Sequence, residues 1–274
     1  MSTVGEALRA AAARLAEVTD TARLDAELLM AHALGVTRSD LFLRHMQAEE
    51  PQAFTALIER RAAHEPVAYI IGKQEFYGRS FAVTPGVLIP RADSETTVQA
   101  ALDSARADAR VLDCGTGSGA LLLTFLAERP GARGLGIDAS EAARQCAQAN
   151  AEALGLADRA QIIAADWTHP GWADELGRFD LVIANPPYVE AEAALDRQVR
   201  DWEPAEALFA GAEGLDDYRV LIPQLRDLLA AGGVAVLEIG WQQAEAVSAL
   251  AEAQGFVSEL RRDLAKRPRA LILR

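Results

Sequence analysis

The chain has 274 residues, half of them hydrophobic, which is enough for one large domain or two smaller ones with a sizeable core. The formal net charge of −13 is carried by both parts of the chain without a basic stripe, which argues against a protein that grips nucleic acid through phosphates or binds anionic membranes. Two cysteines, no leader-like start and no apolar run near the ~20 residues of a membrane span predict a cytoplasmic protein without disulfides.

The first 66 residues carry apolar side chains at helical spacing. Thr3 and Glu6 stand in capping-box register ahead of the first stripe. Gly35 provides a stop for a second helix, a short third follows, and Pro51 and Pro66 bracket a fourth. These features predict a small bundle of four helices. Its histidines lack the spacing of metal ligands, so no metal site is expected.

Glycine and proline punctuation marks a boundary near residues 73–90. Two β-rich runs flank Gly78 and predict a hairpin, and a turn at Pro85 and Gly86 follows. We therefore expect a helical domain at 1–72, a hairpin linker at 73–90 and a second domain at 91–274.

From residue 91 onward the pattern alternates between strands and helices. The expected helices cover 94–107, 120–128, 141–154, 218–229 and 243–254. The expected strands cover 110–113, 134–137, 160–164, 179–184, 233–239, 256–260 and 270–273. Such alternation is typical of an α/β fold with a doubly wound, mostly parallel sheet.

The strand at 179–184 is apolar and β-branched, and it ends in Asn185-Pro186-Pro187-Tyr188. The two prolines stop the strand because they offer no N–H to the ladder. Asn185 is therefore expected at the carboxyl end of a central strand, where open α/β sheets bind ligands. The Asn185 side-chain carbonyl and the Pro186 carbonyl could accept both N–H groups of a planar amine, either a carboxamide or the exocyclic amine of a base. A simple turn after a strand is the alternative.

A glycine-rich turn joins the strand at 110–113 to the next helix and reads Gly115-Thr116-Gly117-Ser118-Gly119. Its G-x-G-x-G spacing differs from the dinucleotide pattern G-x-G-x-x-G, and Asp113 precedes it. An acidic entry suits a ligand with an amine and a carboxylate, such as S-adenosylmethionine, better than a pyrophosphate. Taken alone, the loop is equally compatible with an ordinary strand–helix turn.

Acidic residues end the two following strands. Asp138 could accept from both ribose hydroxyls, or it could cap the next helix, although Ser140 is the better cap. Asp166 could accept from an adenine amino group beside an apolar wall made by Trp167, or it could be a surface residue of a loop. Because these strand ends converge with Asn185 on one crevice, a nucleoside-type cofactor is predicted.

The chain resembles the peptide chain release factor glutamine methyltransferases over almost its whole length. The matching stretches are Glu65-Pro66-Val67-Ala68-Tyr69-Ile70, Glu75-Phe76-Tyr77-Gly78, Val87-Leu88-Ile89-Pro90-Arg91, Asp113 to Gly119, Asn185 to Tyr188, Glu203-Pro204 with Ala207-Leu208, Gly214-Leu215-Asp216, and Glu238-Ile239-Gly240 with Gln242 or Gln243. The chain departs from the family's sequence pattern at residues 92–95, where Ser94 stands in place of Thr, and at residues 266–269.

The resemblance implies a seven-stranded class I methyltransferase domain that uses S-adenosylmethionine, preceded by a helical domain that recognises the substrate. It also implies methylation of the glutamine of a Gly-Gly-Gln loop in release factors. Asn185 and Pro186 would orient the amide, and Tyr188 would pack on its plane. An N6-adenine methyltransferase of DNA or RNA is the alternative, but it needs base flipping and a basic groove.

Overall fold

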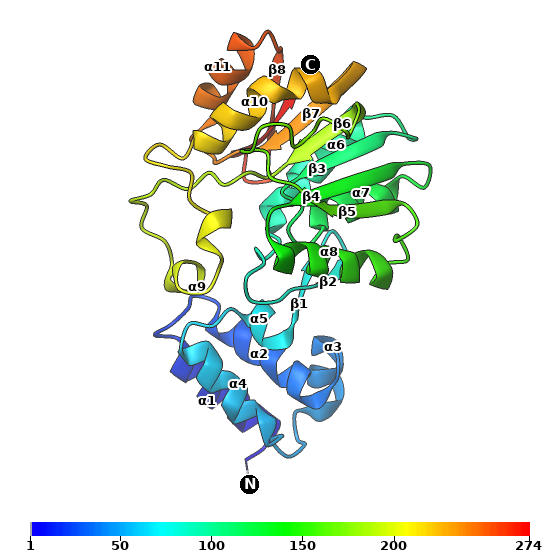
Figure 1. Ribbon diagram of the computed structural model, residues 1–274. Helices are drawn as coiled ribbons and strands as arrows, with labels where there is room; N and C mark the ends of the chain where they lie inside the picture. The colour runs from blue at the N-terminus through cyan, green and yellow to red at the C-terminus, as the bar shows by residue number, and fades with distance from the viewer. Residues whose placement is uncertain (1) are drawn as a thin grey trace. The chain divides into compact units, whose positions relative to one another are not determined.

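The computed structural model describes residues 2–274, which fall into two compact units (Figure 1). The helical unit comprises residues up to Lys73 together with Leu195–Trp202, and the sheet unit comprises Gln74–Ala194 and Glu203–Arg274. Within the described residues, no helix has the length and apolar character needed to cross a membrane.

The helical unit packs its helices around one apolar core that includes Leu15, Leu29, Met30, Leu41 and Phe54. Its helices are α1 (Val4–Leu15), α2 (Ala22–Leu34), α3 (Arg38–Asp40), a π-helix at Leu41–His45, α4 (Ala53–Ala62), α5 (Val67–Ile71) and, from the later segment, α9 (Arg197–Arg200). Thr3 and Glu6 form the expected capping box. The expected short third helix is divided in two. Thr37 caps α3, and the chain then widens into the π-helix.

The segment Leu195–Trp202 belongs to the helical unit, although the sequence placed it in the second domain. The cause is a buried ion pair. Arg61 Nε donates to Asp25 Oδ2 at 2.6 Å, and Arg61 Nη2 donates to Gln198 Oε1 at 3.1 Å. A buried guanidinium needs partners for all its N–H groups, and Gln198 supplies one that is distant in sequence.

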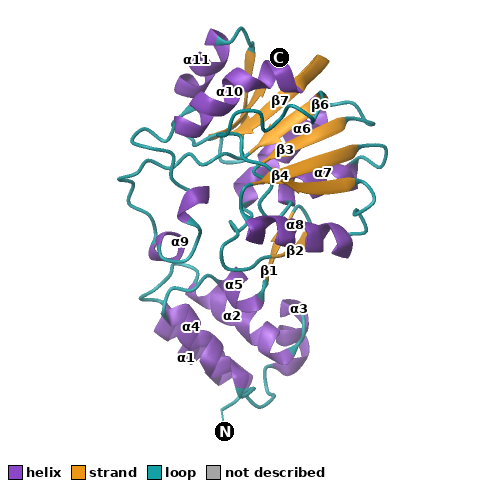
Figure 2. Cartoon of the chain, viewed as in Figure 1, coloured by secondary structure: helices purple, strands orange, loops and turns teal. Residues whose placement is uncertain are grey.

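The sheet unit holds a seven-stranded sheet in the order β5-β4-β3-β6-β7-β9-β8. Figure 2 draws its strands in orange. Its strands are β3 (Arg110–Cys114), β4 (Arg133–Asp138), β5 (Ala160–Ala164), β6 (Phe179–Ala184), β7 (Leu229–Glu238), β8 (Ser258–Arg262) and β9 (Pro268–Leu273). The first five are parallel, and β9 is antiparallel to β7 and β8. The predicted doubly wound α/β fold is confirmed.

Helices cover both faces of the sheet because successive strand residues point to opposite sides. Val111, Leu181 and Ile183 pack in one core with α6 (Glu95–Ser104) and α7 (Ala120–Glu128). Leu112 and Val182 pack in a second core with α10 (Asp216–Leu228) and α11 (Ala244–Ala253). The remaining elements of this unit are the hairpin β1 (Lys73–Phe76) and β2 (Arg79–Ala82), α8 (Glu141–Ala153), and 3₁₀ turns at Ala92–Ser94 and Ala205–Ala207.

The order of the strands positions the site. The chain runs outward from β3 through β4 to β5, then returns to β6 on the other side of β3. Such a reversal opens a crevice at the carboxyl ends of the strands on either side of it. The β3–α7 turn and Asn185 follow strands that end at this crevice, and Asp138 is the last residue of another such strand.

Candidate active site

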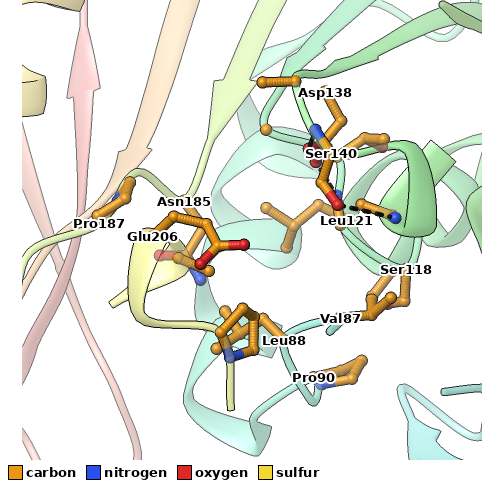
Figure 3. Close-up of a pocket in the computed structure, with 18 of the residues that line it drawn as sticks. Val87, Leu88, Pro90, Ser118, Leu121, Asp138, Ser140, Asn185, Pro187 and Glu206 are labelled. Carbon is orange, nitrogen blue, oxygen red and sulfur yellow. Dashed lines mark hydrogen bonds between the residues drawn. The ribbon is translucent and has the colours of Figure 1, made fainter. Parts of the chain in front are cut away.

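A pocket of about 350 Å³ lies in the sheet unit at the carboxyl ends of β3, β4, β5 and β6 (Figure 3). Its volume is in the range of small-molecule sites. Most predicted site residues line it, namely Gly115, Thr116, Gly117, Ser118, Asp138, Asp166, Trp167, Asn185 and Pro187. Gly119, Pro186 and Tyr188 are not among the lining residues.

The glycine-rich loop is held tightly against the sheet. The N–H groups of Gly115 and Thr116 both donate to the Ile137 carbonyl at 2.9 Å. Gly115, Gly117 and Gly119 all have positive φ, at +75°, +57° and +82°. A Cβ on Gly119 would stand 2.7 Å from a methyl carbon of Leu123 in α7. Gly119 therefore allows the turn to pack closely against α7, and it does not line the pocket.

Asp138 ends β4 and is locked by its own backbone surroundings. Its Oδ2 accepts from Gly117 N and its Oδ1 from Ser140 N, both at 2.9 Å. Ser140, and not Asp138, caps α8 by accepting from Ala143 N. Each carboxylate oxygen keeps a lone pair, because it has two and uses one. Burial raises the pKa of Asp138, while the N–H donors oppose that shift.

Asp113 supports the loop from beneath and does not line the pocket. Its Oδ2 accepts from Thr116 Oγ1 at 2.7 Å, and within residues 2–274 its buried Oδ1 has no hydrogen-bond partner. Burial raises the pKa of Asp113 to about 7, opposed by the Thr116 hydrogen bond and reinforced by the charge of Asp138.

Asp166 and Trp167 form another wall of the pocket. Asp166 Oδ1 already accepts from the N–H and hydroxyl of Thr168, at 2.9 and 2.7 Å, and Oδ2 faces His169 Nδ1 at 2.9 Å. Only Oδ2 keeps a lone pair for a further donor. The Trp167 ring lies so close to the loop that a Cβ on Gly115 would meet it at 3.0 Å. Its indole N–H donates to Asp217 Oδ1 at 3.2 Å.

Asn185 is half-buried at the end of β6 and borders the pocket. Figure 3 places its side chain around the same hollow as Asp138 and Glu206. No hydrogen bond within residues 2–274 engages the Asn185 amide or the Pro186 carbonyl. Pro186 itself is buried, whereas Pro187 lines the pocket. The acceptors that the sequence assigned to a substrate amide are thus unused by the folded chain.

Tyr188 packs behind this turn, away from the pocket. Its ring contacts the apolar core on the α10 side of the sheet, and it stands near the buried carboxyl of Glu238. Burial raises the pKa of the Tyr188 hydroxyl, and the Glu238 charge adds to that effect. The ring is thus a packing aromatic that supports the turn from behind.

Two further segments line the pocket that sequence reasoning left without a role. Residues 86–91 form one wall, and Glu206 lies on another. Buried Glu203 is bonded to the wall at 86–91. Its carboxylate accepts from Ile89 N at 3.2 Å and pairs with Arg91 Nη2 at 2.5 Å. The motifs Val87 to Arg91 and Glu203-Pro204 were visible in the sequence, but their pairing across more than 110 positions was not.

The charges around the pocket fit S-adenosylmethionine. Four carboxyl-bearing residues line it, Asp138, Asp166, Glu206 and Asp217, and the guanidinium of Arg91 is already paired with Glu203. An acidic pocket attracts a sulfonium and repels a pyrophosphate. Gly117 adds room, because a Cβ there would meet nothing within 4 Å. Asp138 would hold the ribose hydroxyls and Trp167 would flank the base.

Comparisons with known proteins match both parts of the chain. Residues 6–72 match a family described as the PrmC N-terminal domain, and residues 90–207 match the methyltransferase small domain. A methyltransferase structure from Pyrococcus furiosus superposes with a TM-score of 0.54, covering 80% of this chain and 96% of that one at 16% identity, which supports the fold alone.

Curated relatives extend over nearly the whole chain. A release factor glutamine methyltransferase from Rhodospirillum rubrum is 43% identical over 259 residues, which cover 92% of this chain and 78% of the relative. One of the same name from Cereibacter sphaeroides is 44% identical over 257 residues, covering 92% and 90%. At this identity and coverage, the chain belongs to the release factor glutamine methyltransferase family.

Proposed function

We propose that this protein transfers a methyl group from S-adenosylmethionine to the side-chain amide nitrogen of the glutamine in the Gly-Gly-Gln motif of peptide chain release factors. The observation that carries the proposal is the pair of free acceptors, Asn185 Oδ1 and the Pro186 carbonyl, at the strand end beside an acidic pocket. Family membership supplies the class of substrate.

The cofactor-binding role falls to residues of the β3–α7 turn and the neighbouring strand ends. S-adenosylmethionine, when bound, supplies an electrophilic methyl group on a positively charged sulfur. Asp138 accepts from the ribose hydroxyls with its remaining lone pairs, and the backbone of Gly115 to Ser118 allows close approach. Asp166 Oδ2 accepts from the adenine amino group, and Trp167 provides the apolar wall.

The substrate-binding role falls to Asn185, Pro186, Pro187 and Tyr188. An amide nitrogen is a poor nucleophile because its lone pair is delocalised into the carbonyl. Asn185 Oδ1 and the Pro186 carbonyl accept one N–H each, which fixes the orientation of the nitrogen. The same acceptors stabilise the positive charge that develops on the N–H groups. Once the nitrogen carries the methyl group, one of its N–H protons leaves to water, so no dedicated base is required. The prolines stiffen this array, and Tyr188 holds it from behind.

We assign recognition of the release factor to the helical domain at 1–72, with 73–90 as the linker and 91–274 as the catalytic domain. Every nucleoside-type feature of the sequence lies after Arg110. With a net charge of −13, binding of nucleic acid is not part of the proposed function. The two cysteines, Cys114 and Cys146, are free and buried, which suits the cytoplasm.

The decisive experiment supplies methyl-labelled S-adenosylmethionine and a purified release factor, then locates the label by mass spectrometry. A label on the Gly-Gly-Gln glutamine is expected. Parallel reactions with DNA and RNA test the adenine alternative, and label on adenine with an unlabelled release factor would overturn the proposal.

The assignment of the helical domain can be tested on the full-length chain by hydrogen exchange. Adding the release factor should slow exchange within residues 1–72, whereas adding the cofactor alone should slow it around the pocket. Protection of residues 1–72 by the cofactor alone would contradict the assignment.

A further inference from the structure

Gln243 connects three loops at the substrate side of the sheet unit. It lies at the start of α11, after the turn that follows β7, yet its side chain does not cap the helix. Its Nε2 donates to the Tyr188 carbonyl at 3.0 Å and to the Gly214 carbonyl at 3.1 Å. Its Oε1 accepts from Gly240 N at 3.0 Å. The amide thus uses both donors on backbone carbonyls of two distant segments and its acceptor on an N–H of its own turn.

The three segments pack closely around the Gln243 amide. A Cβ on Gly214, whose φ is +66°, would stand 2.3 Å from the Tyr188 carbonyl oxygen. A Cβ on Gly240 would stand 2.6 Å from Gln243 Oε1 and 3.4 Å from the Tyr188 ring. Two carbonyls and one N–H face the amide, so a single orientation of its oxygen and nitrogen satisfies all three.

These bonds fix the far end of the turn that begins at Asn185. After Tyr188 the chain is held by Val189, whose N–H donates to the Leu208 carbonyl at 2.8 Å and whose carbonyl accepts from Ala210 N at 2.9 Å. The two prolines leave the turn little freedom of its own. Gln243 is the side chain that anchors the Tyr188 carbonyl, so the placement of the Asn185 and Pro186 acceptors depends on it.

We propose that Gln243 is a positioning residue for methyl transfer: it clamps the loops of Tyr188, Gly214 and Gly240 together and thereby sets the geometry of the acceptors that orient the substrate amide. This role rests on the proposed function. Gln243 does not line the pocket, so its loss should lower kcat and leave cofactor affinity nearly unchanged. A misplacement of about 1 Å in an orienting group costs on the order of 100-fold in rate.

The chain provides a matched control in the neighbouring residue. Gln242 is exposed, whereas Gln243 is half-buried with all three hydrogen bonds made. Gln243→Glu keeps the shape and the acceptor for Gly240 N but turns a negatively charged oxygen toward two carbonyls. Gln242→Glu makes the same charge change in solvent.

The experiment measures kcat and KM on a purified release factor, cofactor affinity by calorimetry, and hydrogen exchange of the segment at 189–191. For Gln243→Glu we expect kcat to fall about 10- to 100-fold, cofactor affinity to stay within about two-fold, and exchange at 189–191 to speed up. Gln242→Glu should match the wild type. Gln243→Met, which removes the hydrogen bonds without adding charge, should show the same pattern with a smaller loss.

Wild-type activity is measured first and separates the two proposals. If the wild type does not methylate the release factor, the proposed function fails. If the wild type is active and Gln243→Glu and Gln243→Met keep its kcat, only the positioning role fails. Loss of the cooperative melting transition in both variants, or a fall in cofactor affinity as large as that in kcat, would make Gln243 a general structural residue and would also overturn the proposal.

Discussion

The ends of β4 and β6 each carry a polar side chain, but within residues 2–274 only the one at the end of β4 is hydrogen-bonded. At the end of β4, both oxygens of Asp138 accept backbone N–H groups, so the side chain is fixed before any ligand arrives. At the end of β6, within the part of the chain that the structure describes, the Asn185 amide accepts nothing. Under the proposed function, the protein prepares the cofactor side with its own backbone and leaves the substrate side with open acceptors.

The proposed function explains this difference by what each strand end would hold. A ribose presents two hydroxyls at a fixed spacing, which a locked carboxylate with remaining lone pairs can meet. A substrate amide arrives on another protein and brings both N–H donors itself, so acceptors already satisfied by the fold would have nothing to offer. Open acceptors in turn require rigid surroundings, which Pro186 and Pro187 provide.

The largest expected effect comes from removing the open acceptor. Asn185→Ala should lower the methyl-transfer rate about 10²–10³-fold, or about 2.7–4 kcal/mol, by analogy with the loss of an oxyanion-hole donor. Cofactor affinity should change far less, because Asn185 follows the strand and stands apart from Asp138. Single-turnover rates and calorimetry measure the two quantities. A folded Asn185→Ala protein with the wild-type rate would contradict the assignment.

Asn185→Asp sharpens the same comparison. It keeps an acceptor at the end of β6 and adds a negative charge, so its rate should lie between those of Asn185→Ala and the wild type. A rate below that of Asn185→Ala would mean that charge at this position matters more than the acceptor.

The next largest effect is on cofactor affinity and concerns Asp138, the hydrogen-bonded carboxylate at the end of β4. Asp138→Ala should weaken S-adenosylmethionine binding by roughly 1.5–3 kcal/mol, about 10- to 150-fold, the scale for hydrogen bonds to a charged group. Calorimetry measures the affinity, and Asp158→Ala, which changes an exposed carboxylate, serves as the control. An unchanged affinity would remove Asp138 from the cofactor site.

The buried carboxyl at the end of β7, the strand next to β6, leads to a prediction about how stability depends on pH. Glu238 ends β7, and burial raises its pKa from 4.5 to about 7, opposed by hydroxyl donors and Arg269 and reinforced by Asp93. Because the folded state holds this proton more tightly than the unfolded state, the stability it contributes is present at low pH and is lost as the pH rises through about 7.

Between about pH 5.5 and about pH 8, this loss should amount to about 2 kcal/mol of unfolding free energy. Glu238→Gln cannot ionise and should remove that part of the pH dependence, as measured by denaturant unfolding at several pH values. Glu252→Gln, an exposed change on α11, should not. Equal pH slopes for the wild type and Glu238→Gln would show that Glu238 is charged and solvated throughout.

The smallest expected effect belongs to Asp166. One of its oxygens is fully used by Thr168, so only Oδ2 remains for an adenine amino group. Asp166→Ala should weaken cofactor binding by about 1 kcal/mol, about five-fold. Asp174→Ala, an exposed change in the same loop, should leave affinity unchanged. A loss as large as that of Asp138→Ala would show that the two strand ends share the cofactor equally.

The sheet and most of the pocket wall could be predicted from the sequence because those features have local causes. Apolar β-branched runs predict buried strands, Pro186 and Pro187 end one of them, and glycines permit the positive φ angles of the loop. Parallel strands end at one edge, so Asp138 and Asn185 could be placed together before any contact was known.

The side chains that bridge distant segments could be identified only in the folded chain. The sequence could not show that Gln198 joins Arg61 or that Glu203 joins Arg91, because such pairing depends on which buried donors and acceptors lack partners after folding. It also could not distinguish Gln242 from Gln243, identical neighbours in the same motif. Only the folded backbone turns one amide to solvent and sets the other against two carbonyls and an N–H.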